Sequence, residues 1–285
     1  MNANILTVPT QSELGFKLVP DTLASLLGTL TNPWLYLSGP TVNPTGLLYD
    51  NKEISDILAV CAEYGARVVI DTCFSGLEFR RDGWEGWNLK NCLSSLTCTT
   101  TNSSFAVSLL GGLSFELLTG GLEFGFLILN EPTLIDAFST LPSLGRPHST
   151  VKYAIKKLLG LGGQKFQQFS RVMDEQKDIL TSRSDCLMKT LRSCGWDVVG
   201  CCGGVSMVAK PTAYLGKMLK LDDFEAKLDA TNFRQAVLKA TGLCINSGSW
   251  TGIPNYCRLA FALENSEFER ALQCITRFKK LVLEN

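Results

Sequence analysis

Two short apolar runs constrain the fold of this chain more than any other feature. Trp34–Ser38 stops at Gly39-Pro40, and Arg67–Asp71 ends in a carboxylate. Short runs of this kind, bounded by turn signals, are typical of strands buried on both faces. Residues 51 to 64 lie between them and carry apolar side chains at helical spacing, with Gly65 at the expected stop. This order of strand, helix and strand predicts an α/β fold: a mostly parallel sheet with helices on its faces.

The pattern changes along the chain. Strands are also expected over 104–110 and 124–129, whereas long helical patterns begin near residue 150. We expect the second part to contain helices over 151–161, 164–194, 231–241 and 267–283, and strands over 196–199, 205–209, 243–246 and 256–262. The sequence therefore predicts two domains. Residues 1–150 form a large α/β domain, and residues 151–285 form connecting helices and a smaller α+β domain.

Composition excludes several classes of protein. Lysine and arginine together equal aspartate and glutamate at 27 each, so no basic surface for nucleic acid is expected. Eleven cysteines form no C-x-x-C pair, and His148 is the only histidine, which argues against a metal site. No secretory signal and no apolar run of membrane-spanning length is visible. We expect a cytoplasmic protein with reduced cysteines, no metal and no membrane partner.

Three polar segments could form a binding site. Asn43-Pro-Thr-Gly46 is a turn sequence just after the first strand, and Asp71 lies 28 positions further on, at the end of the second. Ligands of parallel sheets bind beyond the carboxyl ends of the strands, where Asp71 is expected. Arg258 lies in an apolar strand, and its guanidinium could hold a carboxylate. The alternatives are an ordinary turn, a capping aspartate and a structural salt bridge.

Together these segments resemble the class I/II (fold type I) aminotransferases, enzymes that use pyridoxal phosphate. The resemblance implies that Asn43 hydrogen-bonds the phenolic oxygen of the pyridoxal ring. It implies that Asp71 pairs with the ring nitrogen, and that Arg258 binds the α-carboxylate of the substrate. A carboxylate at the ring nitrogen keeps the ring protonated and therefore able to accept electrons. The fold implied is a partial fold type I large domain followed by a smaller C-terminal domain.

The chain departs from this family at three positions. Gly111 occupies the expected position of the Schiff-base lysine, and no lysine lies between Lys90 and Lys152. Phe74 replaces a tyrosine that supports the ring oxygen, and Glu123 replaces an arginine that binds the cofactor phosphate. Without the lysine there is no covalent anchor and no proton shuttle. We therefore expect no transaminase activity and, at most, non-covalent binding of pyridoxal phosphate.

The resemblance is more detailed to one group of proteins. The LSGP sequence before Asn43, the run from Ser108 to Asn130 and residues 146–153 resemble the C-terminal aminotransferase-like region of plant methionine S-methyltransferases. This implies a cytosolic plant protein whose ligand is an amino acid of the methionine type. No glycine-rich strand–turn–helix of the methyltransferase type is present, and only 42 residues precede Asn43. The chain is therefore interpreted as a domain of a longer polypeptide.

Three interpretations remain open at this point. The first is a catalytically degenerate aminotransferase-like domain with a ligand-binding, regulatory or assembly role, acting as a homo-oligomer or as partner of another domain. The second is an active enzyme that uses pyridoxal phosphate. The third is a truncated fragment without independent function, whose sheet has an open edge that promotes association.

Overall fold

The computed structural model describes residues 4–79, 86–94, 105–116, 123–140, 147–160 and 162–284. The chain forms two compact units. Unit 1 comprises residues 1–42 and 48–175, and unit 2 comprises residues 43–47 and 176–285. The chain passes from unit 1 to unit 2 within helix α7 (Gly163–Ser193). The sequence predicted a change of domain near residue 150.

Unit 1 contains a four-stranded sheet with the order β1-β2-β3-β4. Its strands are β1 (Trp34–Ser38), β2 (Arg67–Asp71), β3 (Ala106–Gly112) and β4 (Gly125–Ile128). The first three strands run parallel, and β4 is antiparallel to β3. The predicted mostly parallel sheet is therefore confirmed.

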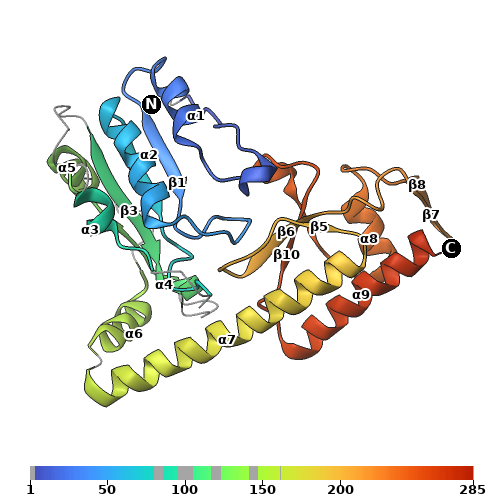
Figure 1. Ribbon diagram of the computed structural model, residues 1–285. Helices are drawn as coiled ribbons and strands as arrows, with labels where there is room; N and C mark the ends of the chain where they lie inside the picture. The colour runs from blue at the N-terminus through green and yellow to red at the C-terminus, as the bar shows by residue number, and fades with distance from the viewer. Residues whose placement is uncertain are drawn as a thin grey trace. The chain divides into compact units, whose positions relative to one another are not determined.

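One face of this sheet is packed against helices. Figure 1 shows α2 (Asn51–Glu63) lying along the sheet, with α1 (Pro20–Leu27) and α3 (Leu89–Ser94) packed beside it. Alternate strand residues enter this core together with apolar residues of the helices: Leu35, Leu37, Val68, Ile70, Val107, Leu23, Ile54, Ile57 and Leu58. The other face differs, because Trp34 and Tyr36 are 50% and 61% exposed. The prediction that β1 is buried on both faces is therefore wrong: its burial alternates as in a half-buried strand.

Local hydrogen bonds fix the ends of α2. Asp50 accepts from the backbone N–H of Glu53 at 2.7 Å, and the Glu53 carboxylate accepts from the N–H of Asp50 at 2.8 Å. Lys17 also donates to Glu53 at 2.7 Å. This capping box satisfies two helix-end N–H groups. Gly65 follows the helix with φ +63°, as expected for a helix stop.

Unit 1 also contains several shorter helical elements. It contains the 3-10 helix η1 (Ser12–Leu14) and the helices α4 (Leu113–Glu116), α5 (Pro132–Thr140) and α6 (Ser149–Leu159). The predicted break between two long helices is confirmed, because α6 ends at Leu159 and α7 begins at Gly163. Helices α1, α3, α4 and α5 were not predicted. No helix in the ranges described above is long and apolar enough to cross a membrane.

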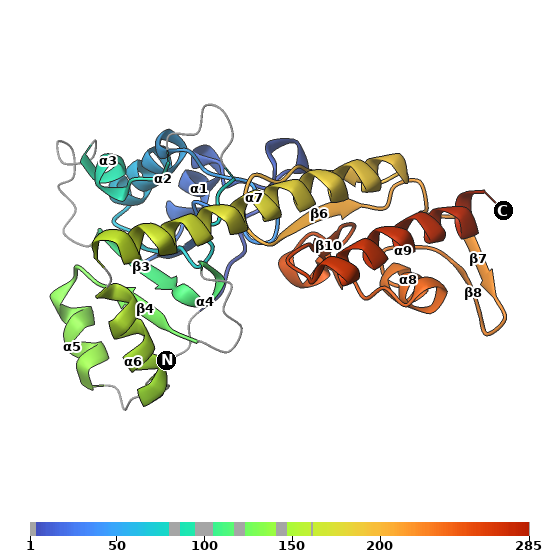
Figure 2. The ribbon, with the colours of Figure 1, turned by 90° about the horizontal axis from the view of Figure 1, so that it is seen from below.

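Unit 2 is an α+β structure, as predicted. An antiparallel sheet has the order β5-β6-β10-β9, and β7 pairs with β8 as a separate hairpin. The strands are β5 (Asp197–Val198), β6 (Ser206–Lys210), β7 (Met218–Leu221), β8 (Phe224–Lys227), β9 (Asn246–Ser247) and β10 (Cys257–Ala260). Its other elements are α8 (Phe233–Thr241), η2 (Gly248–Thr251) and α9 (Asn265–Leu283). Figure 2 shows the C-terminal part of α7 and α9 both running along this sheet.

An aromatic cluster forms the core of unit 2. Trp196, Tyr214, Phe233 and Phe278 are all at most 4% exposed, and their ring centroids lie 5.2 to 5.8 Å apart. The Tyr214 hydroxyl donates to the carbonyl of Cys194 at 2.6 Å, so the buried phenol has a hydrogen-bond partner. Edge-to-face and tilted rings at this spacing pack favourably. The cluster joins the end of α7 to α8 and α9.

The short segment 43–47 belongs to unit 2, although the residues on either side of it belong to unit 1. The carbonyl of Gly46 accepts from the N–H of Cys202 at 2.6 Å. Gly46 has φ +72°, and a Cβ there would lie 2.5 Å from the Cys201 sulfur and 2.7 Å from the carbonyl oxygen of Gly203. Only glycine fits this position without displacing its neighbours.

Gly46 provides a direct test of this packing. We expect Gly46→Ala to lower the free energy of unfolding by about 2 to 5 kcal/mol, because strain at positive φ adds to overpacking. Gly242 is a matched control, since its φ is +80° but a Cβ at that position would have nothing within 4 Å. Gly242→Ala should cost only about 1 to 2 kcal/mol. Urea denaturation followed by circular dichroism measures both; equal losses would contradict the packing described.

An ion pair in unit 1 gives a second test. Arg67, at the start of β2, donates to the two carboxylate oxygens of Glu131 at 2.7 and 2.9 Å, and also to Asn32 at 2.6 Å. Its guanidinium holds the pKa of Glu131 at about 2, below the ordinary value of 4.5. A carboxyl group with a lowered pKa stabilises the fold above its unfolded pKa, and this contribution is lost as it becomes protonated.

We therefore expect part of the free energy of unfolding to be lost as pH falls from about 4.5 to about 2. Glu131→Gln should lower stability at pH 7 and remove this part of the pH dependence. Glu63→Gln serves as the control, because Glu63 is exposed. Urea denaturation across this pH range distinguishes the variants, and parallel curves for wild type and Glu131→Gln would refute the expectation.

Candidate functional site

Asp71 lies at the carboxyl end of β2, and both of its carboxylate oxygens accept hydrogen bonds within unit 1. The Tyr36 hydroxyl donates to Oδ2, and the backbone N–H of Cys73 donates to Oδ1 at 3.0 Å. Tyr36 reaches Asp71 because β1 and β2 are parallel, with Ser38 opposite Asp71 and Tyr36 two residues earlier on the same face. The predicted pyridine-nitrogen partner therefore already has protein donors.

The groups around Asp71 stay protonated at neutral pH. Partial burial raises the pKa of Tyr36, although the residue as a whole is 61% exposed, and the neighbouring Asp71 raises it further. Burial also raises the pKa of the Cys73 thiol to about 12, again with a contribution from Asp71. Tyr36 is therefore a permanent donor to the carboxylate, and Cys73 has no nucleophilic thiolate.

Phe74 lies on the loop after β2, three residues beyond Asp71, as the sequence indicates. Its carbonyl accepts from the Thr41 hydroxyl at 3.4 Å. Glu78 is a buried carboxylate that accepts from the N–H of Gly76 at 2.8 Å and from Thr41 at 3.4 Å. These contacts attach the loop carrying Phe74 to the segment after β1. No sequence motif identified Glu78 or Thr41.

Gly111 lies within β3, not in the turn that follows the strand. It pairs with Phe126 of β4, and a Cβ at Gly111 would lie 2.4 Å from the Phe126 ring. Any larger side chain there would have to displace that ring. The turn after β3 holds α4, which contains no lysine. Glu123 is exposed just before β4.

Arg258 lies on β10 of unit 2 and is partly buried. Its Nε donates to the Ser206 hydroxyl at 2.9 Å, and its guanidinium lies 5.9 Å from the centre of the Trp250 ring. Burial lowers the pKa of Arg258, but a guanidinium still remains charged at neutral pH. Among the described residues no carboxylate pairs with it, so the alternative of a structural salt bridge has no partner there.

The predicted residues are distributed over both units. Asp71, Phe74 and Gly111 lie in unit 1, whereas Asn43 and Arg258 lie in unit 2. Asn43 is exposed at the start of the segment held by Gly46. Sequence reasoning missed Tyr36 and Ser206, the partners of Asp71 and Arg258. For Tyr36 the alternation in Trp34-Leu-Tyr-Leu-Ser38 was a usable signal, because it places both aromatic residues on one face.

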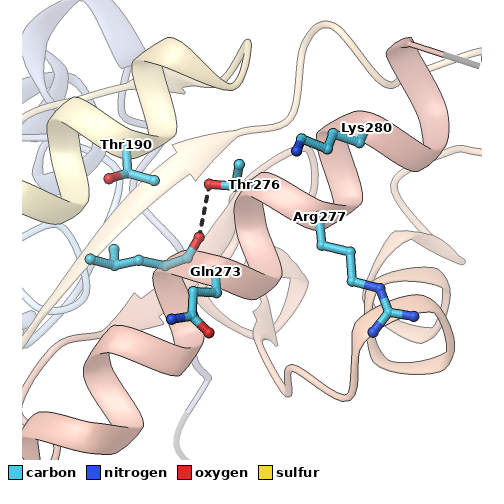
Figure 3. A pocket seen from close by; sticks show the side chains of 6 residues that line it. Thr190, Gln273, Thr276, Arg277 and Lys280 are labelled. Carbon is cyan, nitrogen blue, oxygen red and sulfur yellow. Dashed lines mark hydrogen bonds between the residues drawn. The ribbon is translucent and has the colours of Figure 1, made fainter.

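Two hollows in unit 2 contain none of these residues. The larger, about 410 Å³, is shown in Figure 3 and is lined by Thr190 of α7 and by Gln273, Thr276, Arg277 and Lys280 of α9. There the Thr276 hydroxyl donates to its own helix, at the carbonyl of Leu272. The smaller is apolar, about 90 Å³, and includes Leu187, Ile245 and Phe268. Within the described residues no group of three or more His, Cys, Asp or Glu could hold a metal ion.

Comparison with known sequences identifies relatives over almost the whole chain. The chain is 57% identical to a methionine S-methyltransferase of Hordeum vulgare and 48% identical to one of Arabidopsis thaliana, over 99% of its own length in each case. It spans only 26% of the length of each of these relatives.

Solved structures agree in fold. An aspartate aminotransferase from Rhizobium meliloti matches with a TM-score of 0.77 and 20% identity, over 95% of this chain and 64% of that one. A pyridoxal-phosphate-bound putative aminotransferase from Clostridium difficile 630 matches with a TM-score of 0.77 and 15% identity, over 97% and 66%.

The family model for aminotransferase class I and II matches residues 1–275. The predicted relationship to plant methionine S-methyltransferases is also confirmed, as similarity to one region of those proteins. This chain belongs to the aminotransferase class I and II family.

Proposed function

We propose that this chain is a catalytically degenerate aminotransferase-like domain that binds an amino acid of the methionine type through Arg258. It would serve a regulatory or assembly role in methionine and S-methylmethionine metabolism, as part of a longer methionine S-methyltransferase-type polypeptide. The observation that carries the proposal is a partly buried guanidinium that has no carboxylate partner among the described residues. A buried cation is costly without an anionic partner, and a ligand carboxylate would supply one.

The contacts of Arg258 define the ligand group that it suits. Ser206 accepts from Nε, and this hydrogen bond does not use the two terminal NH₂ groups. Two such donors match the two oxygens of a carboxylate. The Trp250 ring beside the guanidinium restricts its orientation. The choice of a methionine-type ligand rests on the names of the relatives.

The residues around Asp71 do not fit a covalently held pyridoxal phosphate. Residues 91–151 contain no lysine, so the expected segment supplies no primary amine. Each oxygen of Asp71 accepts one hydrogen bond, from Tyr36 and from Cys73, so a ring nitrogen would have to share the carboxylate with these two protein donors. The ring of Phe126 covers Gly111. These three observations support a loss of transamination chemistry.

The setting of the domain is proposed as well. The relatives are several times longer than this chain, which supports a role as the partner of another domain. A homo-oligomer is the second arrangement proposed. The balanced charge favours neither nucleic acid nor an anionic membrane surface as a partner. A cytoplasmic location remains our expectation.

Isothermal titration with methionine and S-methylmethionine tests ligand binding. We expect at least one of them to bind, and Arg258→Ala to weaken that binding roughly 10- to 100-fold through loss of charge-assisted hydrogen bonds. Arg270→Ala, at an exposed position on α9, should leave the affinity unchanged. The absence of a heat of binding with both amino acids would contradict the proposal.

Methioninamide makes the test specific to the carboxylate. It should bind wild type as weakly as methionine binds Arg258→Ala, and the substitution should not weaken it further. If removing the ligand carboxylate and substituting Arg258 caused additive losses of affinity, Arg258 would contact another part of the ligand.

Borohydride trapping tests the alternative of an active enzyme, which the family match and the cofactor-bound structural neighbour favour. After incubation with pyridoxal phosphate and reduction, mass spectrometry should find no lysine labelled above the level in the denatured chain. The reason is that the expected segment contains no lysine. A single lysine labelled far above that background would establish a Schiff-base residue and overturn the degenerate assignment.

A further inference from the structure

Two exposed tryptophans of this chain each lie beside an arginine. Trp34 is 50% exposed, and its ring centre lies 5.6 Å from the guanidinium of Arg67. Trp250 is 58% exposed, and its ring centre lies 5.9 Å from the guanidinium of Arg258. The two pairs differ in charge. Arg67 is paired with Glu131, whereas no carboxylate pairs with Arg258 among the described residues. Of these two pairs, only the one at Trp250 leaves its arginine to be neutralised by a ligand.

Local structure fixes the position of Trp250 beside Arg258. Trp250 lies on η2, which directly follows β9, and β9 pairs with β10 at Arg258. The N–H of Gly248 donates to the carbonyl of Tyr256 at 2.7 Å. A Cβ at Gly248 would lie 2.3 Å from the carbonyl oxygen of Ile253, so this segment is closely packed. The Trp250 ring is therefore held in place before any ligand arrives, which reduces the entropic cost of binding.

The chemistry of an indole ring indicates which ligand group suits this position. The face of a tryptophan ring attracts cations, and quaternary ammonium ligands are recognised in this way. S-methylmethionine carries a similar cation, a sulfonium with two methyl groups, whereas methionine carries a neutral thioether. Three carbon atoms join the carboxylate to the sulfur, so a ligand whose carboxylate is held by Arg258 can place its sulfur against Trp250. The bound carboxylate neutralises Arg258 and thereby reduces its repulsion of the sulfonium.

We propose that Trp250 is a specificity-determining residue that selects S-methylmethionine over methionine through a cation–π contact with the sulfonium. This role rests on the proposed function, because it takes Arg258 as the group that binds the ligand carboxylate. It adds a partner for the other end of the ligand. The site would then distinguish the methylated amino acid from the unmethylated one by charge.

Isothermal titration of the intact chain with three ligands tests this role. They are methionine, S-methylmethionine and the carbon isostere of S-methylmethionine, in which a CH group replaces the sulfonium. The isostere keeps the shape and loses the charge. We expect S-methylmethionine to bind roughly 3- to 20-fold more tightly than either neutral ligand. Trp250→Leu should remove this difference, and Trp250→Phe should keep part of it, because a phenyl face attracts cations less strongly than an indole face.

Trp34→Leu is the matched control, since it makes the same change at an exposed tryptophan beside an arginine and should leave all three affinities unchanged. Thermal melting followed by circular dichroism checks that each variant is folded. Equal affinities of S-methylmethionine and its isostere would refute the role of Trp250, and so would an equal weakening of all three ligands by Trp250→Leu. If methionine still binds through Arg258 in either case, the proposed function stands without this role. An absence of binding by all three ligands would refute both.

Discussion

The parallel pairing of β1 with β2 is the constraint on which the rest of unit 1 depends. It places Ser38 opposite Asp71 and therefore brings the two polar strand ends to one edge of the sheet. It also places Tyr36 on the same face as Asp71, within hydrogen-bonding distance. A one-residue shift of β1 against β2 would turn Tyr36 to the opposite face, into the core under α2 and away from Asp71. The fold, the state of Asp71 and the exposed aromatic residues of β1 follow from the same set of backbone hydrogen bonds.

Much of this fold could be predicted from local pattern. The span of β2 is as expected, and α2 is bounded by the predicted Gly65 and by the capping pair Asp50 and Glu53. The capping box and the glycine act through neighbouring residues, so the sequence displays them directly. In contrast, burial of β1 depends on which elements pack on each face, and a five-residue apolar run does not show this.

The candidate site was predictable only in part, for a similar reason. Asp71 and Arg258 were identified because their residue types and settings resemble a known family. Their partners Tyr36 and Ser206 lie 35 and 52 positions away in sequence, and only the strand register brings them close. The position of Gly111 inside β3 follows from its pairing with Phe126, which no local signal indicates. For the chemistry, the consequence is that Asp71 accepts two hydrogen bonds from the protein, whereas Arg258 has no carboxylate partner among the described residues.

The placement of segment 43–47 has a consequence for how the chain acquires its structure. Gly46 contacts Cys201, Gly203 and Ser206, so a part of unit 2 is made about 150 residues before the groups that enclose it. During synthesis this turn cannot make its contacts until residues 201–206 have left the ribosome. Bringing the turn and the 201–206 loop together costs chain entropy before any stabilising contact forms, and contacts of this long-range kind form slowly. Unit 2 therefore cannot be completed by its C-terminal residues alone, and cutting the chain between the two units would separate this turn from the loop that holds it.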